Sequence, residues 1–478
     1  MSQHIRKGHS FCEENINQIM KRITHRLIGI LIVLFYPYTL LAQVMGIEDA
    51  VNATLSNYPS LSAAQSALEV VRENAQVIKD NRLPNVRLHD QINVGTANGL
   101  SGSYFSMGLI VPTSGGRRPE NSSDLASGNI ALATADWEVY NFGRFQAEDR
   151  LAKADILVGE AAVENEKFGI RQTVINTYLD LLWLRQTIKI EQRNIARVDT
   201  VRRIITNLVH NGIRPGLDSS LASVEFSRAK LNYFQMQEQL QRAFIQLATL
   251  TGRPVNQLEI DTTFQEQALL MQPLDMKLTA DHPLLRYQTN LVNRQNFEVE
   301  LIRKSALPKV SLLASTWARG TSLDIDNNFG PLGSGFGYSR TNFLVGVAAT
   351  VNLTDFHRIK NRSQLQQWRI KQACSQLQTQ QIQLQNTLTT SDSVMATVRL
   401  ALMELPTALN SAERAYQQRL SLYNNGIENI LGLTDALQLL TTVEKQAVSI
   451  QRRAVDVRLQ RAYATSNFDD FFSLFRRQ

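Results

Sequence analysis

Cysteine and long hydrophobic runs are both scarce in this sequence. Only two of its 478 residues are cysteines, and one of them, Cys12, precedes a predicted cleavage site. The other, Cys374, then has no partner for an intramolecular disulfide, so stability must come from packing and assembly. We expect Cys374 to be a small residue on a helix, packed in the core or in a helix seam. After residue 41 no stretch reaches 18 consecutive apolar residues, which excludes a membrane-spanning helix from the rest of the chain.

The first 42 residues have the pattern of a secretory signal peptide. Basic residues within 21–26 precede an apolar run, 27–41, that ends at Ala42. At about 15 residues this run is short for a membrane helix. We therefore predict a signal peptide at 1–42, with Met20 as an alternative start. Its removal takes away five basic and two acidic residues and leaves 45 and 41, a balance too even to favour nucleic acid as a partner.

Short sequence words recur along the chain in one order, which indicates an internal duplication. Two of them recur at an offset of 224 residues and two at an offset of 214. We predict a first structural repeat at 43–252, an inter-repeat equatorial linker at 253–281 and a second repeat at 282–478. The matching words are 58–61 and 282–285, 83–86 and 307–310, 141–144 and 355–358, and 211–213 and 425–427.

Two stretches of each repeat place apolar residues at steps of three and four, the period of an α-helix. In the first repeat these are 144–211 and 217–250, and in the second they are 358–425 and the residues after its Asn-Gly-Ile word. Pro406 is expected to kink or break the longer helix of the second repeat. Each repeat is therefore predicted to be a long helical hairpin that folds at Asn-Gly-Ile. Helices of this length with charged flanks are typical of a coiled coil.

Other stretches alternate with a period of two, which favours β-strands. Strands are predicted at 86–94, 129–140, 310–315 and 343–353, with loops rich in Gly, Ser and Asn at 96–128 and 319–341. One face of the last strand is apolar, as expected for a strand that faces lipid. That face carries Phe343, Val345, Val347, Ala349 and Val351.

Four strands per chain are too few to close a hollow barrel, and an open sheet edge cannot face lipid. The sequence therefore predicts an oligomer. The expected fold class is a mixed α+β membrane protein. Four strands of each chain contribute to a shared β-barrel, beside long coiled-coil hairpins.

Several words in this order resemble the TolC family of outer-membrane efflux and secretion channel proteins. They are Leu-Pro-x-Val before the first strand of each repeat, Trp-Glu-Val-Tyr-Asn-Phe-Gly-Arg at 137–144, Tyr-Asn-Asn-Gly at 423–426 and Leu-Thr-Asp-Ala at 433–436. The resemblance covers essentially the whole mature chain. It implies a homotrimer whose twelve strands form one barrel in the outer membrane and whose helices form an α-barrel in the periplasm.

The resemblance also implies a function and partners. The chain would be the exit duct of a tripartite efflux or type I secretion system. It would work with a periplasmic adaptor (membrane fusion) protein and an inner-membrane RND, ABC or MFS pump, without a catalytic step or a cofactor.

A gate at the periplasmic tips follows from the same resemblance. It matches the family's tip tyrosine to Tyr423, the hydrogen-bond partner of that tyrosine to Asp218, and one of two aspartates that narrow the bore to Asp435. The second aspartate position holds Gly432, and the position of an intersubunit arginine holds Glu428. Fewer carboxylates in this ring are expected to weaken cation selectivity. The alternative is that Tyr423 and Asp218 are simply exposed tip residues, and that Asp435 is solvated like a helix N-cap residue rather than part of a pore ring.

The tips themselves are candidate docking points for the adaptor. Gly212, Ile213, Gly426 and Ile427 occupy them. The alternative is plain turn chemistry, because Asn-Gly suits a tight reversal whatever binds to it.

The runner-up function is a secreted or periplasmic coiled-coil structural or adaptor protein that never enters a membrane. It would expose the apolar stripe near 343–351 to water. An enzyme is not favoured, because no nucleophile motif and no carboxylate pair has a readable spacing. No metal site is predicted, since the histidines after residue 42 are scattered and 324–328 lacks the glycine and glutamate of a calcium loop.

Overall fold

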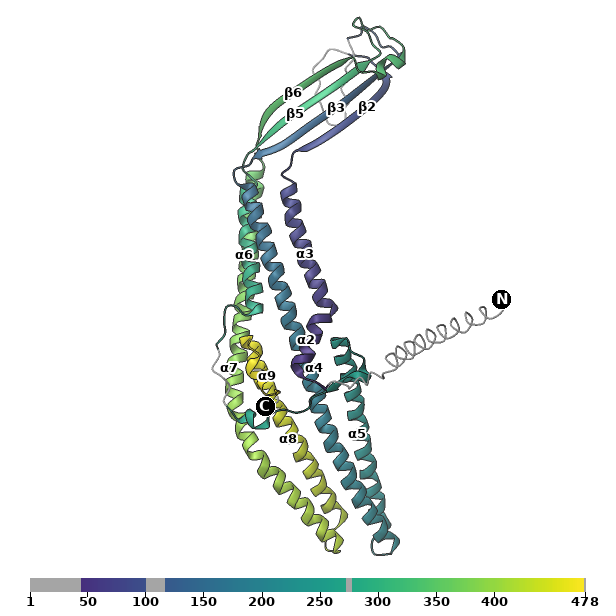
Figure 1. The fold of residues 1–478 in the computed structure, drawn as a ribbon, viewed down its shortest axis with the longest axis vertical. Helices are drawn as coiled ribbons and strands as arrows, with labels where there is room; N and C mark the ends of the chain where they lie inside the picture. Colours follow the sequence, from purple (N-terminus) through teal and green to yellow (C-terminus); the bar gives the residue numbers. More distant parts are fainter. Residues whose placement is uncertain (1–43, 100–116, 272–276, 477–478) are drawn as a thin grey trace, which may run out of the picture.

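The computed structural model describes residues 44–99, 117–271 and 277–476. The predicted signal peptide and the middle of the first predicted loop lie outside this part. The molecule is elongated, with a β-sheet at one end and the turns of two helical hairpins at the other (Figure 1). Its helices are α2 (Ile47–Asn57), α3 (Pro59–Asp80), α4 (Arg144–His210), α5 (Gly216–Thr251), α6 (Pro283–Lys304), α7 (Asp355–Asn424), α8 (Ile430–Thr465) and α9 (Asp469–Ser473), with short 3-10 turns η1 (Val255–Gln257), η2 (Glu266–Leu270) and η3 (Leu332–Phe336). The strands are β1 (Val44–Met45), β2 (Asn85–Thr96), β3 (Leu125–Tyr140), β4 (Glu259–Ile260), β5 (Lys309–Thr321) and β6 (Arg340–Thr350).

The large sheet has the order β2-β3-β5-β6, and all its neighbouring strands are antiparallel. Two of its strands come from each predicted repeat. Within the described residues, β2 and β6 are therefore edge strands with one neighbour each. Each edge carries a row of backbone N–H and C=O groups that a further strand can pair with.

The strand register builds one apolar face across all four strands. Val345 pairs with Ala314, which pairs with Ala135, which pairs with Val86. The next row along the sheet begins at Phe343 and ends at Leu88, through Thr316 and Ala133. Directly opposite residues of an antiparallel pair point to the same face. The alternation predicted for the last strand is thus continued by side chains of the other three.

Several strand ends differ from those predicted. β3 begins at Leu125 and β5 runs to Thr321, so both extend into the predicted loops. β6 ends at Thr350, which leaves Val351 one residue beyond the strand. The extra length arises because residues 322–339 fold back over the ends of β3 and β5. Ser127 Oγ donates to the carbonyl of Leu332, and Asn129 Nδ2 donates to that of Phe336.

The two hairpins follow the predicted helix pattern closely. α4 and α7 have 67 and 70 residues, and α5 and α8 have 36 each. At about 1.5 Å per residue, α4 is roughly 100 Å long. A kink or a break was predicted at Pro406; the helix does not break there, because α7 is continuous through it. Proline removes one backbone hydrogen bond, and the packing of α8 along α7 holds the helix together on both sides of it.

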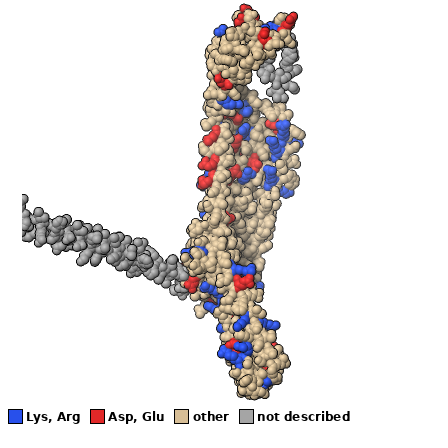
Figure 2. All heavy atoms as spheres, turned by 90° about the vertical axis from the view of Figure 1, so that its right-hand side faces the viewer, with Lys and Arg blue, Asp and Glu red and all other residues tan. Residues whose placement is uncertain are grey.

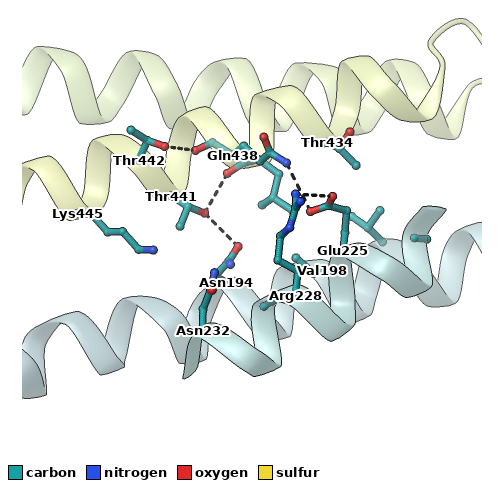
Figure 3. A pocket seen from close by; sticks show the side chains of 14 residues that line it. Asn194, Val198, Glu225, Arg228, Asn232, Thr434, Gln438, Thr441, Thr442 and Lys445 are labelled. Atoms are coloured by element: carbon teal, nitrogen blue, oxygen red, sulfur yellow. Dashed lines mark hydrogen bonds and ion pairs between the residues drawn. The ribbon is translucent and has the colours of Figure 1, made fainter. Parts of the chain in front are cut away.

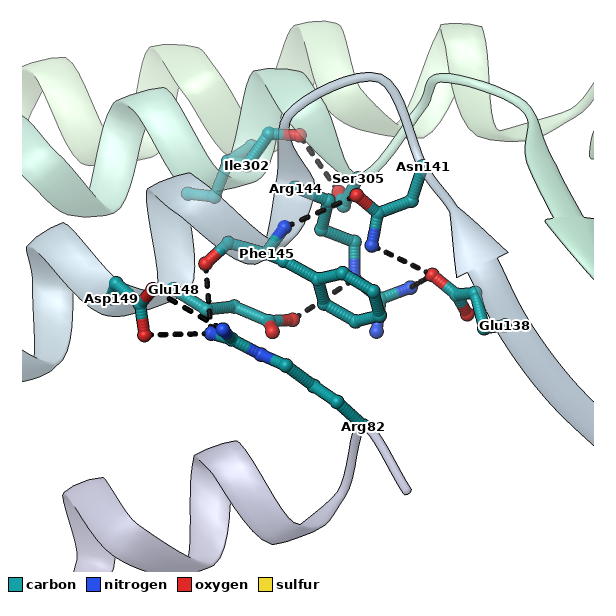
Figure 4. Close-up of polar contacts among 9 residues, drawn as sticks. All are labelled: Arg82, Glu138, Asn141, Arg144, Phe145, Glu148, Asp149, Ile302 and Ser305. Carbon is teal, nitrogen blue, oxygen red and sulfur yellow. Dashed lines mark hydrogen bonds and ion pairs between the residues drawn. The ribbon is translucent and has the colours of Figure 1, made fainter. Parts of the chain in front are cut away.

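The sheet is fixed to the helices at the start of α4 (Figure 4). Arg82 donates to both carboxylate oxygens of Asp149, at 2.7 and 3.2 Å, and to the carbonyl of Phe145 at 2.9 Å. These hydrogen bonds from Arg82 lower the pKa of Asp149. Trp137 donates from its indole to the carbonyl of Arg82. Just before the helix, Gly143 has a φ of 91°, a conformation that favours glycine.

A compact body surrounds the middle of the long helices. Its buried residues come mainly from α2, α4, α5, α8 and α9, and β1 pairs there with β4 in parallel. The hydroxyl of Tyr178 lies 2.9 Å from the carbonyl oxygen of Met45 and 2.8 Å from that of Asp261. The predicted linker, 253–281, supplies β4, η1 and η2 to this body. The exact bounds of the repeats and the linker stay predictions.

Two further findings concern the surface. Cys374 is exposed, so the expectation that it is packed is wrong for the single chain; it lies next to Ala373, which takes the buried position on α7. Charged side chains gather over the helices and near the tips, while the sheet carries few of them in the view of Figure 2. None of the helices in the described part of the chain is both long and apolar enough to span a membrane.

Candidate functional site

The two hairpin turns have the same local geometry. Gly212 has a φ of 70° and Gly426 a φ of 76°, both in the left-handed region that glycine adopts without strain. The amide of Ile213 donates to the carbonyl of Leu208 at 2.9 Å, and in the second turn Ile427 makes the equivalent bond at 3.0 Å. Such bonds satisfy the last carbonyls of a helix. Ile213 and Ile427 are both exposed at the end of the molecule.

Tyr423 is the buried residue of the second tip. Its side chain is 1% exposed, and its hydroxyl has no hydrogen-bond partner among the described residues. The hydrogen bond to Asp218 implied by the resemblance is therefore absent from this structure. Burial raises the pKa of Tyr423, with a smaller contribution from the charge of Asp218. The residue that does contact its ring is Arg214, whose guanidinium lies 5.0 Å from the ring centre.

Arg214 also joins the first tip to the second. Its Nη2 donates to the backbone carbonyl of Glu428 at 2.8 Å. The Glu428 carboxylate forms an ion pair with Arg419 of α7 and accepts the amide of Asn429 at 3.0 Å. Asn429 in turn caps α8, because its side chain accepts the amide of Gly432 at 2.9 Å. The sequence flagged Glu428 and Gly432 as departures from a pattern but gave no reason for either.

The other two predicted gate residues lie in less enclosed places. Asp218 is half-buried in the first turn of α5, where a carboxylate interacts favourably with the helix N-terminus. Asp435 is exposed on α8, and within the described residues it forms no hydrogen bond or ion pair. Its carboxylate is thus free to face solvent or a bore.

Further from the tips, α4 and α8 are held together by buried charges that the sequence analysis missed. Arg197 donates to both oxygens of Glu444, at 2.9 Å each, and Lys445 pairs with Glu191 at 2.5 Å. The carboxylates are 8% and 2% exposed. The hydrogen bonds that Arg197 donates to Glu444 raise the pKa of Arg197. Thr441 adds a neutral hydrogen bond to α4. No short sequence pattern reveals these pairs, since Arg197 and Glu444 are 247 residues apart.

A cavity of about 270 Å³ lies between the hairpins (Figure 3). Polar side chains point into it from both sides, and Gln438 of α8 contacts Glu225 of α5 there. Its lining comes from three helices: Asn194, Val198, Val201, Ala222, Glu225, Arg228, Ala229, Asn232, Thr434, Leu437, Gln438, Thr441, Thr442 and Lys445. Within the described residues no group of three possible metal ligands is found, here or elsewhere.

The chain combines a four-stranded sheet, a central body and two hairpins whose turns lie at the same end. This is the fold of a TolC-like outer-membrane channel. More particularly, it belongs to the outer membrane efflux protein family, which matches residues 50–253 and 277–462. The resemblance seen in the sequence is thereby confirmed. Membership of this family places the chain in the outer membrane, extending into the periplasm, and among transport proteins rather than enzymes.

Individual relatives are distant in sequence. The chain is 22% identical over 275 residues to the pyoverdine export outer membrane protein OpmQ of Pseudomonas aeruginosa. That match covers 56% of this chain and 55% of OpmQ, so the chain spans about half the length of this curated relative. Among solved structures, the outer membrane protein VceC of Vibrio cholerae superposes with a TM-score of 0.70 at 16% identity, covering 88% of this chain and 95% of VceC. The CmeC outer membrane channel of Campylobacter jejuni gives a TM-score of 0.69 at 15% identity, covering 90% and 87%.

Proposed function

We propose that this chain is the exit duct of a tripartite efflux or type I secretion system. Three copies assemble into one channel that carries substrates from an inner-membrane pump across the periplasm and the outer membrane. The pump belongs to the RND, ABC or MFS class, and a periplasmic adaptor protein joins it to the channel. The chain itself performs no chemical step, so its residues act by enclosing a path and by opening it.

The observation that carries the proposal is the sheet. Its apolar face runs across four strands, yet β2 and β6 each lack a neighbour on one side within the described residues. An unpaired edge is costly in lipid, because no water is present to bond the backbone. Pairing β2 of one copy with β6 of the next removes every edge. Three copies then give a barrel of twelve strands, with Phe343, Val345, Val347 and Ala349 facing lipid and Val351 at the end of that row.

The helices support the same assembly. Leu217, Val224 and Leu231 recur every seven residues on α5, and each is more than half exposed in the single chain. In Figure 1, α5 and α7 lie on opposite sides of the hairpin pair. α7 also exposes apolar side chains, Leu400 and Met403 among them. Three copies in a ring bring α5 of one against α7 of the next and enclose an α-barrel. The paired lengths of α5 and α8 support the internal duplication from which the two hairpins derive.

The tips close the duct in its resting state. Arg214 joins the two hairpins of a chain through Tyr423 and Glu428. Asp218 adds a negative charge near Tyr423, and Asp435 of each copy faces the bore. Three Asp435 carboxylates make a ring that favours cations. With Gly432 in place of a second aspartate, this ring is weaker than one with two carboxylates per chain.

The adaptor docks on the exposed turns, at Gly212, Ile213, Gly426 and Ile427. The cavity between α4, α5 and α8 is lined by both charged and apolar side chains, which a partner at the tips can reach between the hairpins. The channel sets limits of size and charge, and the pump selects the substrate. The export of pyoverdine named for OpmQ therefore does not carry over to this chain.

The test is fractionation followed by conductance. The protein is expected in the outer membrane, as an oligomer that migrates as a trimer before boiling and as a monomer after it. Inserted into a planar bilayer, it is expected to give small currents that rise when the tips are opened by mutation. Recovery as a soluble periplasmic protein without detergent, or the absence of any current, contradicts the proposal.

A further inference from the structure

Gly432 of α8 is a glycine whose neighbour leaves no room for a side chain. A Cβ placed there would lie 2.6 Å from Oε1 of Glu428 and 2.7 Å from its Cδ. Ordinary contacts of a Cβ atom are longer than about 3.4 Å. The backbone of Gly432 is helical, so the glycine is not needed for an unusual φ. What it provides is space for the carboxylate of Glu428, which folds over the first turn of α8.

That carboxylate is held in place from two sides. It forms an ion pair with Arg419 of α7, and its Oε1 accepts the amide of Asn429. The side chain of Glu428 is 16% exposed. Because a glutamate side chain is flexible, a Cβ at position 432 would simply push it away. The cost would then be the loss of these two interactions rather than a distorted backbone.

The same residue offers its backbone carbonyl to the first tip. Arg214 Nη2 donates to this carbonyl while its guanidinium covers the ring of Tyr423. The two residues are 214 apart in the sequence, which is the offset between the Asn-Gly-Ile words of the two repeats. Arg214 and Glu428 thus hold equivalent positions in the two turns. We call the hydrogen bond from the Arg214 guanidinium to the Glu428 carbonyl the tip contact.

We propose that Gly432 and Glu428 act together as positioning residues for the tip contact. Gly432 admits the Glu428 carboxylate, the carboxylate fixes the second turn through Arg419 and Asn429, and the fixed turn presents the carbonyl to which Arg214 binds. The charged group that joins the hairpins is therefore the guanidinium of Arg214 on the first tip. Gly432 of α8 determines whether its hydrogen bond to the Glu428 carbonyl is maintained. This deepens the gate of the proposed function and depends on it only for the effect on conductance.

Amide hydrogen exchange of the detergent-solubilised protein, read by mass spectrometry on peptides from the two turns, tests the tip contact directly. In Gly432→Ala the amides of 427–432 are expected to exchange about tenfold faster, the factor that corresponds to the loss of one hydrogen bond to a charged group. Alanine is the better helix former, so without the contact to Glu428 this substitution would slow exchange. Gly216→Ala is the matched control, because a Cβ at Gly216 meets nothing within 4 Å.

A double-mutant cycle separates the proposed cause from a general effect of alanine. In a Glu428→Ala background the carboxylate is already absent, so Gly432→Ala is expected to add nothing or to slow exchange. Arg214→Gln is expected to speed exchange in both turns. Unchanged or slower exchange in Gly432→Ala alone, or an equal effect in both backgrounds, overturns the inference. Planar-bilayer conductance of the same variants is then a separate test: faster exchange with unchanged conductance upholds the tip contact and contradicts the gate.

Discussion

The ring and the hydroxyl of Tyr423 have different surroundings, and this difference decides what each contributes. The ring is buried under Arg214, whereas the hydroxyl has no partner among the described residues. Removing an unsatisfied buried hydroxyl is neutral or stabilising by up to about 1 kcal/mol. Tyr423→Phe is therefore expected to leave the conductance and the heat stability of the trimer unchanged.

Tyr423→Ala removes the ring as well, at a cost of about 3–5 kcal/mol typical of a large buried aromatic. It is expected to raise single-channel conductance, because Arg214 loses the surface it covers. The two variants form a matched pair at one position. A conductance increase in Tyr423→Phe would instead show that the hydroxyl makes a bond in the assembled channel.

A second residue, His282, gives the body around the middle of the molecule a pH dependence. It is fully buried; Nδ1 accepts the amide of Leu284 at 3.2 Å, and Nε2 lies 2.8 Å from the carbonyl oxygen of Tyr463, to which it donates. The neutral ring can make both hydrogen bonds, because Nδ1 accepts and Nε2 donates. Burial lowers the pKa of His282. Above about pH 6.5 the ring is neutral in both folded and unfolded chains. Below that value the unfolded chain binds a proton that the folded chain does not. The free energy of unfolding therefore decreases as the pH is lowered.

Hydrogen exchange of peptides that contain Leu284 is the measurement for His282. Protection is expected to be lower at pH 5.5 than at pH 7.5, after correction for the intrinsic rate. In His282→Gln this difference is expected to disappear. His210→Gln is the control, since His210 is exposed at the end of α4. An equal pH dependence with and without His282 would assign the effect to other groups.

At the scale of elements, the packing of α4 on α8 depends on carboxylates that are nearly inaccessible to water. Removing one partner of a buried ion pair costs about 3–5 kcal/mol, because the other charge stays buried. Glu444→Ala is expected to destabilise the contact between the hairpins by about this amount, since it leaves Arg197 without its bidentate partner. Faster exchange in α8 and a lower melting temperature are the readouts.

Two further variants serve as controls for the Glu444→Ala experiment. Replacing Arg197 and Glu444 together by methionine is expected to recover much of the loss, because no unpaired charge remains. Glu238→Ala removes a carboxylate from an exposed pair with Arg242 on α5, and such pairs contribute about 0–1 kcal/mol. A similar loss in Glu238→Ala and Glu444→Ala would argue against a special role for the buried pair.

Strand β6 allows a test of the lipid-facing row with neighbouring residues. Val345 lies on the apolar face, and Gly346 points to the other face, where a Cβ would meet nothing within 4 Å. A lysine at the middle of a lipid-facing strand costs about 2–4 kcal/mol. Val345→Lys is expected to reduce the amount of heat-modifiable trimer in the outer membrane, while Gly346→Lys is expected to assemble normally. The reverse result would place the lumen on the side of Val345.

The sequence predicted those elements whose signal is local. The helical spacing of apolar residues predicted the ends of α4 and α5 to within a residue or two, because no proline interrupts these helices and glycine lies at their ends. Strand ends were missed where a loop folds back on β3, because that pairing depends on residues about 200 positions away. The tip contact and the pair of Arg197 with Glu444 were missed for the same reason. The resemblance singled out Tyr423 but did not indicate Arg214, whose guanidinium covers the ring. The gate roles of Tyr423, Asp218 and Asp435 stay predictions.

At the scale of the whole molecule, the described part of one chain leaves strand edges and exposed helix faces without a partner, and the proposed ring of copies pairs both. Within the residues that the structure describes, the sheet has an open edge on either side, and the hairpins have an apolar stripe on α5 and exposed apolar residues on α7. An apolar stripe with a seven-residue spacing is typical of a helix that packs against another helix. In a ring of copies, one rotation brings both the strand edges and the exposed helix faces of each copy against those of the next. The barrel and the helical tunnel are therefore expected to form in a coupled manner.

The stripe on α5 gives the sharpest test of that coupling. Glutamates at Val224 and Leu231 would be buried without partners between copies, so the double variant Val224→Glu/Leu231→Glu is expected to lose most of its heat-resistant trimer. Ser223→Glu adds a charge to the same helix one position outside the stripe and is expected to assemble like the wild type. If the double variant keeps a trimer of normal heat resistance, the stripe does not lie between copies. The oligomer would then depend on the strand edges alone, and the helices of one chain would have to enclose the duct by another arrangement.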